Sequence, residues 1–308
     1  MGGILIGLVL VAIIATVVAV LVARGPFRRV GVDESLVPAT VAVTSRIRLR
    51  NTVAVVAAVI VAVLLLGYGG AVPSDLGRIV LIAPVLTVAT GILFFSIVPA
   101  FRESSPRRSA DLAPRTALTF GTRRSYAVAA ALVGGLVTAI VVLGLLGSPD
   151  GRSVSRAGEN FGMTASPYPG FYYGTPTLAA VALLVGVVVL AIARIARAPR
   201  PGDPGLREAD AALRQLAIVV VLRATAAGAA ATLAAMLIGA GITTSSISRG
   251  MATGDPAGDA PSDALLHALG IGTSIVGMGL AVLAVVLSVA AITNALRAPL
   301  ALSSVTAS

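Results

Sequence analysis

The sequence contains no cysteine, no tryptophan and no lysine, and it has a single histidine, His267. Without cysteine the chain has no disulfide bonds, no thiolate nucleophile and no Cys-ligated zinc or iron–sulfur centre. A single histidine excludes every site that needs two imidazoles. Charge is also scarce, because only 12% of the 308 residues are Asp, Glu, Lys or Arg. These absences remove many of the residue types on which enzymes depend.

The chain consists mostly of apolar residues. Hydrophobic residues make up 57% of it, and the 33 glycines raise the apolar fraction to about two-thirds, well above the roughly 45–50% of soluble domains. A hydrocarbon core of about 30 Å requires about 20 apolar helical residues. Seven stretches have this length: 3–23, 53–72, 77–98, 126–147, 176–196, 217–242 and 264–296. We therefore expect an all-α, polytopic transmembrane bundle of seven spans, in a single domain with no separate soluble part.

The arginines indicate how the bundle is oriented. Eighteen of the 23 lie in segments 24–52, 99–125 and 194–216 or after the last span; four lie in the alternate connections and one, Arg223, within a span. The positive-inside rule then predicts a cytoplasmic-membrane protein with its N-terminus outside and its C-terminus inside. The net charge of +10 therefore does not indicate nucleic-acid binding. We expect the basic loops to contact anionic lipid headgroups instead.

Two spans contain residues that can interrupt a membrane helix. The third span has Pro84, Thr87 and Gly91, and the seventh has Thr273, Ser274 and Gly277. One interpretation is a solute path, because a broken helix exposes carbonyl groups near the middle of the membrane. The other is a kink with close helix packing, in which hydroxyl groups bond the freed carbonyls and small residues form the contact.

Arg223 is the clearest charge within a span. It has the chemistry to bind an anionic substrate or lipid, but its position near the cytoplasmic end of the sixth span allows it to reach the headgroups. We predict this second role. Asp255, Asp259, Asp263 and His267 are spaced by four residues, and on one continuous helix they would form a face of ligands for a divalent cation. Pro256 and Pro261 break such a helix, so we do not expect a metal site here.

No other pattern indicates chemistry. Apart from His267 at the outer end of the last span, the spans contain no Asp, Glu or His, and the chain has no phosphate-binding loop. We accordingly predict no catalytic, cofactor-binding or metal-ligating residues, no cofactor and no enzymatic activity.

Local patterns predict several details of the helix ends and loops. Asp210 and Arg214 favour a helix that starts at Leu206 and continues into the sixth span. Thr175-Pro176 and Ser262-Asp263 have the pattern of helix starts. The tyrosines of segment 168–174 predict an anchor in the headgroup layer; a ligand-binding cluster is the alternative.

Three short segments resemble motifs of a known group of proteins. They are Arg108-Ser-Ala-Asp-Leu-Ala-Pro-Arg115, Tyr168-Pro-Gly-Phe-Tyr-Tyr-Gly174 and Arg197-Ala-Pro-Arg-Pro201. They are similar to segments in an uncharacterised family of multi-pass integral membrane proteins from high-GC Gram-positive bacteria. The resemblance implies a location in the bacterial cytoplasmic membrane and identifies no catalytic or binding residue.

Two functions are compatible with these observations. A structural or accessory subunit of a membrane assembly, with a membrane-protein partner, accounts for the short loops and small-residue faces. A facilitator-type transporter or channel would use the third and seventh spans. Because no span contains an Asp or Glu, and the single His267 lies at the outer end of the last span, we favour the accessory subunit.

Overall fold

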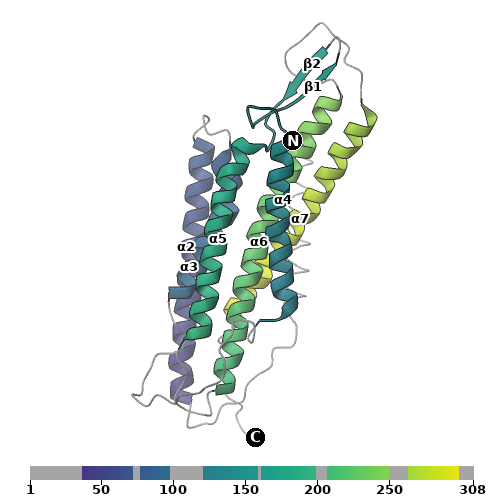
Figure 1. The fold of residues 1–308 in the computed structure, drawn as a ribbon. Coiled ribbons are helices and arrows are strands. Elements are labelled where there is room, and N and C mark those ends of the chain that lie inside the picture. The colour runs from purple at the N-terminus through teal and green to yellow at the C-terminus, as the bar shows by residue number, and fades with distance from the viewer. Residues whose placement is uncertain are drawn as a thin grey trace.

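The computed structural model describes residues 37–71, 77–97, 121–158, 161–198, 207–249 and 263–297. These residues form six long helices and one small hairpin (Figure 1). The helices are α2 (Val37–Ala71), α3 (Arg78–Ile97), α4 (Arg123–Leu146), α5 (Phe171–Arg197), α6 (Arg207–Ser248) and α7 (Ala264–Arg297). By length and composition all six could cross a membrane, which confirms the helical architecture expected of a multi-pass protein. The predicted first span, 3–23, lies outside the described residues.

Four of the six helices begin where a sequence signal places them. Helix α4 begins after Thr122, whose hydroxyl oxygen accepts a hydrogen bond from the N–H of Ser125 (3.2 Å). The predicted cap at the last span is confirmed, since Asp263 Oδ1 accepts a bond from the N–H of Leu266 (3.0 Å). Helices α3 and α6 begin within one residue of their predicted starts.

Two helix starts differ from the prediction. Helix α2 begins 16 residues before the predicted span, so it includes part of the basic segment before that span. The predicted start at Thr175-Pro176 is wrong, because α5 begins at Phe171 and Pro176 lies inside it. Thr175 instead donates a hydrogen bond to the carbonyl of Phe171 (2.9 Å).

Helix α6 is the centre of the bundle, and α2 lies at its edge (Figure 1). Helix α6 contacts α3, α4, α5 and α7, and 67% of its most apolar stretch is buried, compared with 6% for α2. The fully buried apolar side chains come mainly from α3 to α6: Val85, Leu136, Ile140, Leu184, Ile218, Val221 and Met236. Large apolar side chains also cover the outside, as in a bundle surrounded by lipid.

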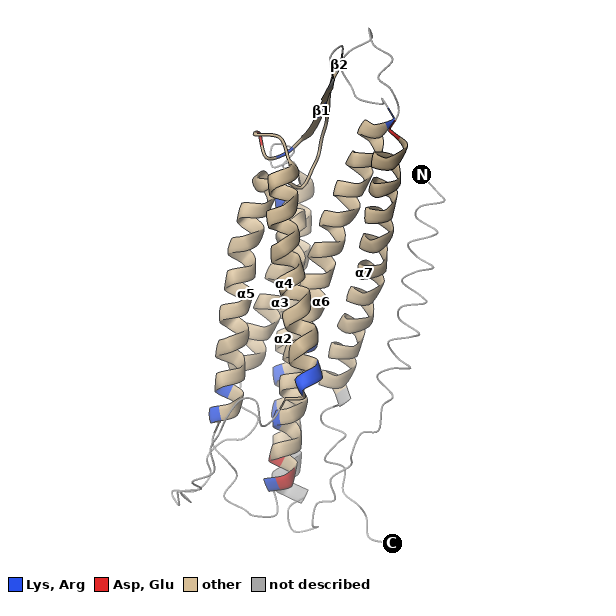
Figure 2. Ribbon diagram, turned by 45° about the vertical axis from the view of Figure 1, so that its right-hand side comes forward, with Lys and Arg blue, Asp and Glu red and all other residues tan. Residues whose placement is uncertain are grey.

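The arginines divide between the two ends of the bundle (Figure 2). We call the end where α2, α4 and α6 begin the arginine-rich end; it has Arg46, Arg48, Arg50, Arg123, Arg124, Arg194, Arg197, Arg207 and Arg214. We call the opposite end the hairpin end; its described arginines are Arg78, Arg152, Arg156 and Arg249. Most of the described arginines therefore gather at one end of the bundle.

The connection between α4 and α5 contains secondary structure that the all-α prediction did not include. Strands β1 (Val154–Gly158) and β2 (Phe161–Ala165) pair antiparallel, with Val154 opposite Ala165. The hairpin projects beyond the helices and contacts α6 (Figure 1). The membrane part is helical as expected, and the strands add a small polar cap to one end.

Helices α6 and α7 make the most extensive contact, at a row of glycines. A Cβ atom on Gly270 would lie 2.6 Å from the backbone nitrogen of Ser245, and one on Gly277 would lie 2.8 Å from Ile238 Cγ1. Gly241 faces Gly270 and Ser274 from the other helix. A Cβ atom on Gly239, two residues before Gly241 on α6, would meet open space.

Candidate functional site

A cavity of about 280 Å³ lies between α2, α3, α6 and α7, in the half of the bundle nearer the arginine-rich end. We call it the α2–α7 cavity. Its lining is almost entirely apolar and includes the face of α2 from Asn51 to Ala62, together with Ile92 and Phe95 of α3. The polar residues in the lining are Asn51, Thr87 and Ser288. Such a cavity suits an apolar group, with polar contacts at a few points.

Arg50 lies next to the arginine-rich end of this cavity, beside the lining residues Asn51 and Phe95, but does not line the cavity itself. Its guanidinium lies over the ring of Phe95, which lines the cavity, with 4.1 Å between Cζ and the ring centroid. The side chain is almost completely buried, and its Nε donates to Asn51 Oδ1 (3.3 Å). Asn51 in turn donates to the backbone carbonyl of Ala295 on α7. Among the described residues, no carboxylate lies within ion-pair distance of Arg50.

Thr87 is the second unusual polar group of the cavity. Its hydroxyl oxygen is buried and forms no hydrogen bond with any described residue. A buried hydroxyl without a partner costs about 1–3 kcal/mol in protein mutational data. The other hydroxyl in the lining, that of Ser288, bonds the carbonyl of Ala284 (2.8 Å). The Thr87 hydroxyl can therefore donate a hydrogen bond to a molecule bound in the cavity.

The six predicted path residues do not lie together. Thr87 and Gly91 line the α2–α7 cavity, whereas Thr273, Ser274 and Gly277 do not. Helices α3 and α7 are also continuous, so the predicted interruptions are absent. Thr273 and Ser274 donate to carbonyls of their own helix, at Leu269 and Gly270 (2.8 and 3.1 Å). These observations match the alternative interpretation, close packing.

Pro84 also serves in packing. It lies inside α3, and a Cβ atom on Gly228 of α6 would lie 3.3 Å from its carbonyl oxygen. Nearby, Thr232 of α6 donates a hydrogen bond to the carbonyl of Leu81 (3.4 Å). Pro84 thus lies where α6 packs closely against α3, and the hydroxyl of Thr232 bonds a carbonyl one turn before the proline.

Arg223 is half-buried on α6 and has no hydrogen bond or ion pair with the described residues. It lies beside Ala224, which lines the cavity, but does not line the cavity itself. An arginine in this position can extend toward the headgroups. That Arg223 contacts lipid headgroups and does not bind a substrate stays a prediction.

Arg214 is the most extensively bonded charge of the arginine-rich end. Its Nε donates to Asp210 Oδ2 (2.8 Å), and both side chains are less than 10% exposed. Its Nη1 donates to the carbonyls of Ile195 and Ala198 at the end of α5 (both 2.9 Å). The predicted i,i+4 pair is confirmed, and it also caps a neighbouring helix, which the sequence did not indicate.

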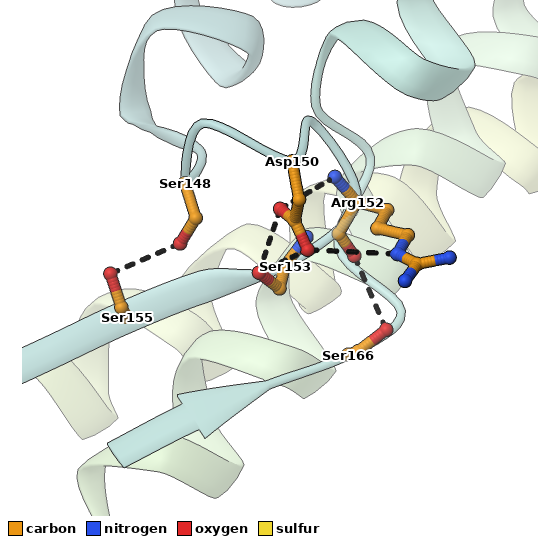
Figure 3. A network of polar contacts seen from close by, with 6 residues as sticks. All are labelled: Ser148, Asp150, Arg152, Ser153, Ser155 and Ser166. Carbon is orange, nitrogen blue, oxygen red and sulfur yellow. Dashed lines mark hydrogen bonds and ion pairs between the residues drawn. The ribbon is translucent and has the colours of Figure 1, made fainter. Parts of the chain in front are cut away.

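The hairpin end has a polar network centred on Asp150 (Figure 3). Its carboxylate accepts bonds from the Ser153 hydroxyl (2.8 Å) and from the N–H groups of Arg152 and Ser153. These bonds, that of the Ser153 hydroxyl first, lower the pKa of Asp150. Ser148 also bonds Ser155 (3.0 Å), so the turn is tied to β1. The carboxylate of Asp150 accepts hydrogen bonds only from neighbouring residues of its own loop among the described ones, so the network stabilises the turn before β1.

A second cluster joins α6, α7 and the hairpin. Arg249 Nη2 lies 2.8 Å from His267 Nε2, and Ser248 Oγ lies 3.2 Å from His267 Nδ1. Asp263 forms an ion pair with Arg156 of β1 (3.7 Å). Among the described residues no group of three or more Asp, Glu or His side chains could hold a metal. Asp255 and Asp259 lie outside these residues.

The tyrosines of segment 168–174 do not form the expected headgroup anchor. Tyr168 and Tyr173 are 3% and 5% exposed, so they pack inside the protein. Burial raises the pKa of Tyr168. Tyr172 instead lies under Arg78 at the start of α3, with 4.4 Å between Cζ and the ring centroid. The segment therefore stabilises the junction of α3, α5 and the hairpin loop.

Sequence reasoning missed Arg50 as a site residue. Arg50 was one of many arginines that indicated orientation, and its position directly before an apolar run gave no further signal. Arg50 meets Phe95, and its neighbour Asn51 bonds Ala295; both partners are distant in the chain, so only the fold brings them together.

Comparisons of the chain with family models, with curated proteins and with solved structures find no match. The fold and its sites therefore rest on the geometry described above.

Proposed function

We propose that this chain is a non-enzymatic integral protein of the bacterial cytoplasmic membrane that serves as a structural or accessory subunit of a membrane assembly. The observation that carries the proposal is the way the polar groups of the spans are used. Most of their described hydroxyls bond carbonyls of their own or a neighbouring helix, as Thr225 and Thr273 do, and Thr87 is an exception. Within the described helices these groups do not converge on a polar passage between the two ends.

Helix α2 is the best candidate for the surface that meets a partner. It packs mainly on α3, so most of its circumference faces outward. Its exposed large apolar side chains run along the helix: Leu49, Val56, Val59, Ile60, Val63, Leu64, Leu66 and Tyr68. A helix that buries so little of its surface in its own bundle is available for contact with another membrane protein.

The alternative function is a facilitator that passes solute through α3 and α7. The separation of the candidate residues argues against it: Gly277 precedes the cavity residue Ser288 by 11 positions on α7, about 16 Å along the axis. The α2–α7 cavity is also nearly free of polar groups. A polar solute would have no binding groups over most of such a route.

Water accessibility separates the two functions. Thr87→Cys and Thr273→Cys can be made singly, since the chain has no other cysteine. For an accessory subunit we expect neither to react with a membrane-impermeant thiol reagent in cells, while Ser155→Cys on the exposed hairpin reacts. Reaction of both span positions, blocked by one solute, would establish the facilitator instead.

The partner surface is tested by photo-crosslinking. A photoreactive amino acid at Val63 of α2 should give a discrete crosslinked band in cells, and one at Val142 of α4, which is also exposed, is the matched control. Equal crosslinking at both positions, or none at Val63, would contradict a partner surface on α2.

For orientation we propose that the arginine-rich end faces the cytoplasm. Alkaline phosphatase, which is active only outside, should be active when fused after Gly158 and inactive when fused after Gly121. The reverse result would invert the orientation.

A further inference from the structure

We propose that the α2–α7 cavity is a binding site for one anionic phospholipid, with its phosphate on Arg50 and an acyl chain in the cavity. This site is independent of the accessory role proposed above. Four observations carry it: the shape of the cavity, the charge next to one end of it, the unpaired hydroxyl of Thr87, and an opening on the outer surface of the bundle.

The shape of the cavity fits a hydrocarbon chain. Its lining on α2 runs from Asn51 to Ala62, 11 positions or about 16 Å along the helix. A methylene group has about the volume of a water molecule in the liquid, roughly 30 Å³. The cavity volume of about 280 Å³ therefore has room for a segment of acyl chain of about ten carbons. The long, apolar form matches the upper part of an acyl chain better than a compact solute.

The charge at the arginine-rich end fits a phosphate. Arg50 is 7% exposed, and the described residues offer it an amide oxygen and an aromatic ring but no carboxylate. Burying a cation without a counterion is costly. Its terminal nitrogens have no hydrogen bond in the described residues, and a guanidinium can donate two parallel bonds to a phosphate. An anionic headgroup supplies the missing charge.

The hydroxyl of Thr87 gives the cavity a polar contact between its ends. Thr87 precedes Phe95 by eight positions on α3, about 12 Å toward the hairpin end. Its hydroxyl is buried and unpaired, and it lines the cavity. An ester carbonyl of a lipid can accept this hydrogen bond, whereas a hydrocarbon alone leaves it unmade.

The cavity opens on the side of the bundle where α2 and α7 barely contact each other. Val59 of α2 and Ile292 of α7 both line the cavity and are 55% and 45% exposed. A lipid from the surrounding bilayer can therefore insert one chain sideways between these helices. Its headgroup stays at the arginine-rich end, the depth at which headgroups lie in a bilayer.

The test measures how many lipids the purified protein retains. Protein in mild detergent is incubated with phosphatidylglycerol or with phosphatidylcholine, and bound lipid is counted by native mass spectrometry. We expect the wild type to retain one phosphatidylglycerol per chain at concentrations where it retains no phosphatidylcholine. Arg50→Gln should weaken retention at least tenfold, while Arg48→Gln, an exposed arginine two residues away, should leave it unchanged.

A second variant tests the cavity without altering Arg50. Ala62→Phe places a ring in the cavity and should abolish retention, whereas Val63→Phe adds the same ring to the exposed face and should not. This pair decides the proposal even if Arg50→Gln does not fold. Equal retention in Ala62→Phe and Val63→Phe, or equal retention of the two lipids by the wild type, would overturn it.

Another occupant of the opening would also overturn the proposal. Cysteine at Val59 can be combined with single cysteines at residues 10–16 of the predicted first span. If one of these pairs forms a disulfide quantitatively, the chain itself fills the opening. We expect no pair to do so.

Discussion

The buried arginine of α6 gives the sharpest prediction for stability. Replacing Arg214 by Met removes the cation from a carboxylate that is 5% exposed, at Asp210. It also removes the donor that serves the carbonyls of Ile195 and Ala198, where α5 ends. Breaking a buried ion pair by removing one partner costs about 3–5 kcal/mol. We therefore expect the unfolding equilibrium constant to rise by roughly two to four powers of ten.

This loss is measured by unfolding the protein in mixed micelles with increasing SDS and following helix content by circular dichroism. Arg207→Met is the control, because Arg207 lies on the same helix near the same end but is exposed. Arg214→Lys should lose much of the stability too, since one ammonium group cannot reproduce the geometry of the guanidinium. In the double variant Asp210→Asn/Arg214→Met the loss should be smaller than the sum of the single losses. If Arg214→Met and Arg207→Met unfold alike, the reasoning is refuted.

Three further results are expected. Gly270→Ala should destabilise the α6–α7 contact by about 1–3 kcal/mol in the same unfolding assay, because its Cβ meets backbone. Gly272→Ala on the same helix meets open space and should be neutral or slightly stabilising; equal losses would contradict the contact. Asp150→Ala should speed hydrogen exchange in β1 and β2 at neutral pH, and unchanged exchange would show that the turn does not hold the hairpin. Because the folded pKa of Asp150 is lowered, the wild-type contribution is present at neutral pH and is lost only as the pH falls below about 4, where protection of the hairpin should decrease.

The sequence predicted where the helices lie, because the length of an apolar run follows directly from the thickness of the bilayer. It also predicted contacts within one turn of a helix: the cap by Asp263 and the pair of Asp210 and Arg214 are both local. In each case the residues that interact are three or four positions apart.

The rotation of each helix about its axis could not be predicted. In a soluble protein the apolar face marks the interior, but lipid-facing and buried residues of a membrane helix are equally apolar. The sequence therefore does not indicate that Gly241, and not Gly239, makes the close contact with α7. For the same reason the cavity could not be predicted. Nothing in the sequence indicates that Arg50 lies over Phe95 or that Thr87 lines one cavity with Val220 and Ala291.

The hairpin was missed for a different reason. Its strands are five residues long and contain Ser, Arg, Gly and Thr as well as apolar residues. Such short mixed segments have no periodic pattern that separates a strand from a loop.

The position of α6 in the chain has a consequence for how the protein is made. The helix that contacts α3, α4, α5 and α7 is the second to last of the described helices to leave the ribosome. Val85, Leu136, Ile140 and Leu184 share one buried cluster with Ile218, Val221 and Met236 of α6, so this cluster stays incomplete until α6 inserts. We therefore expect the earlier helices to be incompletely packed at first. Their packing is completed when residues 207–248 insert. Nascent chains that stop before this step should be the preferred targets of membrane quality control.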